Sequence, residues 1–124
     1  MGRTKYRVAP ASERQYLGRT FGSKAEMEYC QQLQLEISMG EINSYVCQPR
    51  LWLGVPENVY IPDFLIIPFH RDEWPYYVDI KGVETAKFKR DKKLWAKYAP
   101  LDLHVVKKQG NKFVTTEVVH GITP

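Results

Sequence analysis

The apolar residues of this chain recur with two different periods, and each change of period marks an expected element. Between residues 23 and 40 they return every three or four positions, as in a helix with one buried face. These residues are Ala25, Tyr29, Cys30, Leu33 and Ile37. Ser23 is a good N-cap, Glu26 completes an S-x-x-E capping box, and Gly40 is a natural C-terminal stop. The pattern therefore predicts a first helix between Ser23 and Gly40.

Runs rich in β-branched and aromatic residues follow this helix and predict strands. We expect strands over residues 42–53, 59–67 and 76–81. A turn containing Pro56 separates the first two, and a loop over residues 68–75 separates the second from the third. Because these connections are short, the strands are expected to form an antiparallel meander.

A second helix is expected over residues 85–98, where Pro100 prevents continuation. Its apolar side carries Phe88, Leu94, Trp95 and Tyr98. Further strands are expected over residues 101–106 and 113–119. The order α-β-β-β-α-β, with a small C-terminal extension, predicts an α/β fold in which helices flank a central sheet.

Length and composition fit one domain. The chain has 124 residues, of which 44% are hydrophobic, so one core can form. We expect a basic N-terminal arm over residues 1–20 and a single domain over residues 21–124. Lys and Arg total 18 against 14 acidic residues, and this net charge of +4 permits a polyanionic partner without proving one.

Several classes of protein are disfavoured. Cys30 and Cys47 lack the spacing of a zinc site, and we expect both thiols to be reduced. No window approaches the roughly 18 apolar residues of a membrane span. The first residues have no apolar signal core. We therefore expect a cytoplasmic protein with no membrane partner.

Acidic residues interrupt two of the apolar strands. Asp63 lies in the second predicted strand, and Asp79 and Lys81 share one face of the third. If these strands pair across the 68–75 loop, the two carboxylates converge in a place where burial is costly. A buried carboxylate pair needs a cation, and hard oxygen ligands suit Mg²⁺ or Mn²⁺. The alternative is that both acids face solvent at loop edges and that Lys81 is a surface lysine.

Pro62-Asp63 followed by Asp79-Ile80-Lys81 resembles the signature of the PD-(D/E)XK nuclease superfamily, which includes restriction endonucleases and archaeal-type Holliday-junction resolvases. The common core of that superfamily is also α-β-β-β-α-β. The resemblance implies a restriction-endonuclease-like fold with a mixed central sheet. It also implies catalytic roles for Asp63, Asp79, Lys81 and Glu26, with metal ligands from Asp63, Asp79, Glu26 and the backbone carbonyl of Ile80.

Other segments resemble a family of small phage-encoded proteins of this superfamily, regarded as endonucleases similar to junction resolvases. These segments are residues 21–26, 40–42, 48–50 and 79–85. The resemblance implies a magnesium cofactor for which manganese substitutes, branched or junction DNA as the partner, and the cytoplasm of a bacterial host cell. A resolvase cuts two strands symmetrically, so we also expect a homodimer.

Two residues have more than one interpretation. The capping box explains Glu26 without any metal, although its helix face also allows it to point toward the sheet. Gln48 alternates with Val46 and Arg50, and it lies either at the rim of the site or as an ordinary polar strand residue.

Basic residues gather in two segments that are candidates for DNA binding. In the second helix they are Lys87, Lys89, Arg90, Lys93 and Lys97, and in the arm they are Arg3, Lys5 and Arg7. A charge run of this kind is usually a solvated face. Its position directly after the Asp79–Lys81 strand favours contacts with phosphates instead.

The sequence therefore predicts a Mg²⁺-dependent DNA endonuclease, structure-specific in the manner of a junction resolvase. Within the enzyme class, a nonspecific nicking or single-strand nuclease stays open, and RNA is a less favoured substrate. Outside that class, the alternatives are a non-catalytic DNA-binding module and a structural or partner-binding protein with a degenerate nuclease fold.

Overall fold

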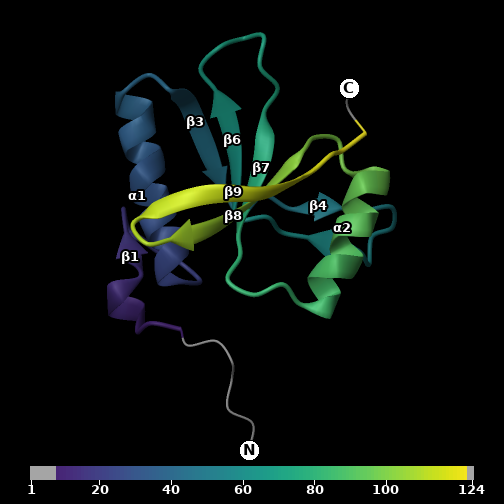
Figure 1. Ribbon diagram of the computed structural model, residues 1–124, viewed down its shortest axis with the longest axis horizontal. Coiled ribbons are helices and arrows are strands. Elements are labelled where there is room, and N and C mark those ends of the chain that lie inside the picture. Colours follow the sequence, from purple (N-terminus) through teal and green to yellow (C-terminus); the bar gives the residue numbers. More distant parts are fainter. Residues whose placement is uncertain (1–7, 123–124) are drawn as a thin grey trace, which may run out of the picture.

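The computed structural model, which describes residues 8–122, has a central five-stranded sheet and two α-helices (Figure 1). The helices are α1 (Lys24–Ser38) and α2 (Ala86–Tyr98). In sheet order the strands are β3 (Ile42–Cys47), β6 (Phe64–Pro68), β7 (Tyr76–Ile80), β8 (Leu103–Gln109) and β9 (Lys112–Val119). The α/β fold class predicted from the sequence is confirmed.

The sheet is mixed because one of its connections is a helix. Strands β3, β6 and β7 pair antiparallel, which confirms the predicted meander. The chain then passes through α2 and returns as β8, which pairs parallel with β7. Strand β9 pairs antiparallel with β8 and forms an edge of the sheet. This crossover places α2 directly after the strand that carries Asp79.

The first two predicted strands are each broken in the structure. The run predicted over residues 42–53 ends as β3 at Cys47, because Gln48 takes a left-handed φ of 51°. The run predicted over residues 59–67 is interrupted at residues 61–63, where Pro62 cannot donate to a sheet ladder. The intervening chain forms a separate hairpin, whose strands are β4 (Leu51–Trp52) and β5 (Val59–Tyr60). Asp63 therefore precedes β6 instead of lying within a strand.

Residues 11–20 form small elements that the hydrophobic pattern does not predict. They are the 3-10 helix η1 (Ala11–Glu13) and the strands β1 (Gln15–Tyr16) and β2 (Arg19–Thr20). Arg14 holds them to the domain: its Nε donates to the Ala9 carbonyl at 2.7 Å, and its Nη1 donates to the Phe21 carbonyl. Because the guanidinium satisfies two carbonyls of irregular backbone, this part of the predicted arm has a defined shape without any partner.

Side-chain caps start both helices. The Ser23 side chain accepts a hydrogen bond from the Glu26 amide at 3.1 Å, and the Thr85 hydroxyl accepts one from the Phe88 amide at 3.1 Å. After α1, Gly40 takes a φ of 74°, which glycine adopts without steric cost. Neither helix within residues 8–122 is long and apolar enough to cross a membrane.

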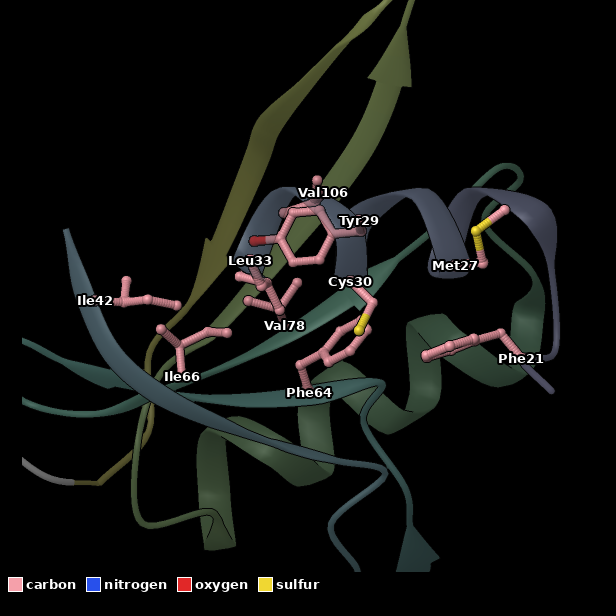
Figure 2. Close-up of a cluster of buried hydrophobic side chains, with 10 residues drawn as sticks. All are labelled: Phe21, Met27, Tyr29, Cys30, Leu33, Ile42, Phe64, Ile66, Val78 and Val106. Atoms are coloured by element: carbon pink, nitrogen blue, oxygen red, sulfur yellow. The ribbon is translucent and has the colours of Figure 1, made fainter. Parts of the chain in front are cut away.

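The sheet buries apolar side chains on both faces. On one face, α1 packs against Phe64, Ile66, Val78 and Val106 (Figure 2). On the other, α2 and the β4–β5 hairpin pack around Trp95, Leu103 and Val105. Because side chains alternate along β7, Val78 belongs to the first cluster and Tyr77 to the second. Asp79 therefore projects toward the α2 side.

Two leucines of α1 test this packing. Leu33 is 1% exposed and Leu35 is 58% exposed. We expect Leu33→Ala to lower the free energy of unfolding by about 2–5 kcal/mol, because it leaves a cavity between α1 and the sheet. Leu35→Ala should change it by less than about 0.5 kcal/mol. Urea denaturation of both variants measures the difference, and equal losses would contradict this placement of α1.

Candidate active site

Asp63 is linked to the Asp79–Ile80 end of β7 by two hydrogen bonds. Asp79 lies in β7 and is 2% exposed, and Asp63 lies directly before β6. The Asp63 amide donates to Asp79 Oδ1 at 3.0 Å, and the Ile80 amide donates to Asp63 Oδ2 at 2.7 Å. Phe64 pairs with Val78, so the same register continued by one residue sets the two acids opposite each other. The structure thus brings the predicted carboxylate pair together.

Lys81 completes the predicted constellation. Its Nζ lies 3.8 Å from Asp79 Oδ2 and 4.4 Å from the centroid of the Phe88 ring. A cation over an aromatic face is attracted by the ring electrons. The Lys81 amide also donates to the Val106 carbonyl at 2.8 Å, which anchors its backbone to β8. The ammonium group is therefore held beside the carboxylates by both α2 and the sheet.

Tyr60 is a site residue that the sequence reasoning missed. Its hydroxyl donates a hydrogen bond to Asp79 Oδ2, and its ring packs edge-on against Trp95 with centroids 5.7 Å apart. Burial and the adjacent Asp79 raise the pKa of Tyr60, so its hydroxyl keeps its proton and remains a donor. The available signal was chemical: a tyrosine in an apolar strand needs a polar partner for its hydroxyl.

The shared burial makes full ionisation of these acids unfavourable. Burial, then the charges of Asp79 and Glu26, raise the pKa of Asp63 from 3.8 to about 8. Burial likewise raises the pKa of Asp79, although Lys81 and the Tyr60 hydroxyl act in the opposite direction. Like charges close together in a poorly solvated place disfavour the charged form. A cation would remove this penalty.

An open pocket of about 340 Å³ gives access to the acids. Asp63, Asp79 and Lys81 line it together with Tyr60 and residues of α2. Within residues 8–122, Asp63 Oδ1 accepts no hydrogen bond, so one carboxylate oxygen on the pocket wall is available to a ligand. The donor set consists of oxygen atoms, and this fits a hard divalent cation such as Mg²⁺ or Mn²⁺.

Glu26 is electrostatically linked to this pair but does not line the pocket. Burial is the main cause of its raised pKa, and the charge of Asp79 adds to it. Its carboxylate also lies 3.3 Å from the Ser23 hydroxyl, in the capping arrangement. Across residues 8–122, no three His, Cys, Asp or Glu side chains are gathered closely enough to form a metal-ligand group. The fold therefore supplies two adjacent carboxylates, and ligation by Glu26 and the Ile80 carbonyl stays a prediction.

Asp91 is a second residue that the sequence reasoning missed. It lies in α2, lines the same pocket and accepts a hydrogen bond from Lys87 Nζ at 2.8 Å. Its charge contributes to the raised pKa values of Asp79 and Tyr60. In the sequence Asp91 lies within a run of lysines, which predicts a solvent-exposed helix position. The usable signal was its spacing, because Asp91 follows the buried Phe88 by three positions and so shares its face.

The remaining predicted residues lie around the site or outside it. Lys87 lines the pocket, and the exposed residues Lys89, Arg90, Lys93 and Lys97 lie elsewhere on α2. Gln48 is exposed, and its amide donates to the Asp63 carbonyl at 2.9 Å, so it adjoins the site through its backbone. Arg3, Lys5 and Arg7 lie outside the described residues. Lys92 is instead paired with Glu84 and Glu117.

Comparison with known proteins identifies a family without indicating an activity. A protein family described as "Protein of unknown function (DUF1064)" matches residues 3–114, which include the whole constellation around Asp63, Asp79 and Lys81. No curated protein and no solved structure matches the chain. The arrangement of the site therefore carries the functional argument.

The carboxylate pair predicts a pH dependence of stability in the absence of metal. Because the pKa of Asp63 is raised in the folded protein, folding favours the protonated acid. Its stabilising contribution is complete below the ordinary pKa of 3.8 and is lost as the pH rises to about 8. We expect urea denaturation in EDTA to show a fall in stability across this window.

Asp63→Asn tests the origin of that fall, because the amide oxygen can still accept from Ile80 but carries no charge. This variant should lose much of the pH dependence and be more stable than wild type at the alkaline end. The control is Asp72→Asn in the exposed loop, which should keep the wild-type profile. Parallel profiles for wild type and Asp63→Asn would show that the buried pair is not the cause.

Proposed function

Because the chain belongs to the DUF1064 family, whose function is unknown, we propose its function from the site: it is a divalent-metal-dependent endonuclease that hydrolyses the phosphodiester bonds of DNA. The observation that carries this proposal is the pairing of half-buried Asp63 with buried Asp79, with Lys81 Nζ 3.8 Å from Asp79 Oδ2. The pair lies at the wall of an open pocket beside a basic helix. Buried carboxylates without a cation cost stability, so this arrangement suits a site that holds a cation for chemistry.

Asp63 and Asp79 would hold the cation, which we propose to be Mg²⁺, with Mn²⁺ as a substitute. Glu26 and the carbonyl of Ile80 are the further candidate ligands. When bound, such a cation polarises a phosphate oxygen and lowers the pKa of a coordinated water. The raised pKa values of the acids support this assignment, since bound positive charge would favour the ionised carboxylates.

The chain's own residues position the groups that react. Lys81 can donate to an attacking water or to a nonbridging phosphate oxygen, and its contact with Phe88 limits the positions of its ammonium group. Tyr60 occupies one oxygen of Asp79 with a hydrogen bond and so orients that carboxylate toward the pocket. Asp91 and Lys87 form the α2 side of the opening.

Contacts to DNA are proposed for the exposed basic residues of α2 and for the basic N-terminal residues. The helix presents Lys87, Lys89, Arg90, Lys93 and Lys97 next to the pocket or along its length, and the N-terminal candidates are Arg3, Lys5 and Arg7. Such contacts neutralise phosphates without reading sequence, and binding through them weakens as salt rises. This supports a polyanionic substrate that approaches the pocket along α2.

The preferred DNA structure and the assembly are the finer parts of the proposal. We favour a branched or junction substrate, a homodimer, and action in the cytoplasm of a bacterial host cell. The alternatives are nonspecific nicking, single-strand cleavage, and DNA binding without catalysis. A binding module would leave the Asp63–Asp79–Lys81 arrangement without a role, and for that reason we place it second.

Cleavage assays separate these possibilities. Labelled four-way junction, matched duplex and single strand are each incubated with Mg²⁺ or with EDTA. We expect cutting of at least one substrate with Mg²⁺ and none with EDTA. Asp79→Asn should lower the rate about 100-fold or more, because it removes charge at the centre of the site. Preference for the junction would support the resolvase-like form of the proposal.

Asp72→Asn provides the matched control, since it makes the same chemical change in an exposed loop. It should cut at the wild-type rate. Loss of activity in Asp79→Asn alone would support the assigned site. DNA binding by all three proteins with no cutting under any condition would favour a non-catalytic DNA-binding module.

A further inference from the structure

A large aromatic side chain is exposed beside the carboxylate pocket. Trp52 is 58% exposed, and it pairs with Val59 across the β4–β5 hairpin. Residues directly opposite in an antiparallel pair project from the same face, so the Trp52 side chain lies next to that of Val59. Val59 lines the pocket that contains the acids. The other pair of the hairpin, Leu51 and Tyr60, is buried in the core.

The apolar surface continues from Trp52 toward the acids. Ile61, which is 45% exposed, lines the same pocket two residues before Asp63. An indole ring on a surface presents a flat face on which an unpaired nucleic-acid base can stack. Val59 and Ile61 line the pocket, and Trp52 adjoins them through its pairing with Val59; we name these three residues the apolar rim.

A smaller hollow of about 90 Å³ extends the pocket along α2. The two hollows share Val59, Tyr60, Lys87 and Asp91, so they adjoin each other, and together we call them the groove. The groove runs between the β4–β5 hairpin and α2, which lie side by side in Figure 1. Its far end is lined by Arg90, with Glu57 and Asn58 from the hairpin.

One basic side chain of this groove is free to bind a phosphate. Within residues 8–122, Arg90 forms no ion pair, whereas the acidic Asp91 is already paired with Lys87. The other carboxylate that lines the smaller hollow, Glu57, forms no salt bridge within residues 8–122. The Arg90 guanidinium can therefore bind a phosphate at this end of the groove.

We propose that the β4–β5 hairpin is the specificity element of the site: Trp52 stacks on an unpaired base beside the scissile phosphate, and Arg90 holds a neighbouring phosphate. The inference rests on the proposed nuclease function and narrows its substrate to DNA that is open at the cut. Bases within a duplex are already stacked on each other, so a base must leave the helix to reach this ring. Single strands, flaps and branch points provide such bases.

Trp74 provides a matched control, because it is 63% exposed yet lies at the other end of the β6–β7 pair from Asp63 and Asp79. We compare wild type with Trp52→Ala, Trp52→Phe and Trp74→Ala. Binding of a short labelled single strand and of a blunt duplex of the same length is measured by fluorescence anisotropy in EDTA, so that neither DNA is cut.

We expect Trp52→Ala to weaken single-strand binding about tenfold, while Trp52→Phe keeps most of it because a ring is retained. Trp74→Ala should bind as wild type does, and duplex binding should be the same in all four proteins. Unchanged single-strand binding in Trp52→Ala, an equal loss in Trp74→Ala, or an equal loss for the duplex would overturn the proposal. Binding of the matching RNA strand much more tightly than DNA would overturn its choice of substrate.

Cleavage with Mg²⁺ distinguishes a failure of this inference from a failure of the proposed function. Suppose that wild type cuts DNA and that Trp52→Ala has the same ratio of single-strand to duplex cleavage rates as wild type. The role proposed for the hairpin is then wrong, and the proposed nuclease function is supported. If nothing is cut but Trp52→Ala still loses single-strand binding selectively, the base-binding surface stands and the nuclease function fails.

Discussion

Placing two carboxylates side by side in the fold costs free energy, and the structure around them reflects this constraint. Asp79 is buried and Asp63 is half-buried beside it, and the charge of Asp79 makes ionisation of Asp63 harder. The fold offsets part of that cost with directed donors: the amides of Asp63 and Ile80, the Tyr60 hydroxyl and the Lys81 ammonium group. Apolar residues in the same places would relieve this cost more simply, and this is the physical reason for the cation that we propose.

The irregular part of the fold serves this arrangement. The chain leaves the sheet after Cys47 and returns at Phe64, and the excursion forms the β4–β5 hairpin. That excursion places Tyr60 against Asp79 and leaves Trp52 exposed opposite Val59, which lines the pocket. The crossover from β7 through α2 adds the opposite wall of the groove, with its lysines and arginine. Chemistry and substrate contacts are thus proposed on the face of the sheet that the hairpin and α2 share.

The sequence predicted the regular elements well because their signals are local. Ser23 and Thr85 begin helices close to the predicted positions, and the antiparallel meander is present. The break at Gln48 was missed because glutamine does not itself call for a left-handed φ. The break at Pro62 could have been predicted, since proline disfavours a strand interior. The convergence of Asp63 with Asp79 followed from strand alternation. The roles of Tyr60 and Asp91 depend on contacts between segments that are distant in the sequence, and a local hydrophobic pattern does not predict such contacts.

Calorimetric titration of the metal-free protein with Mn²⁺ tests the central claim most directly. At a pH below about 8, the account predicts saturable binding accompanied by proton release, because the cation must displace protons held by the Asp63–Asp79 pair. Repeating the titration in buffers of different ionisation enthalpy measures that release. Asp63→Asn should bind more weakly and release fewer protons. The account would be contradicted by the absence of saturable binding, or by binding and proton release that Asp63→Asn leaves unchanged.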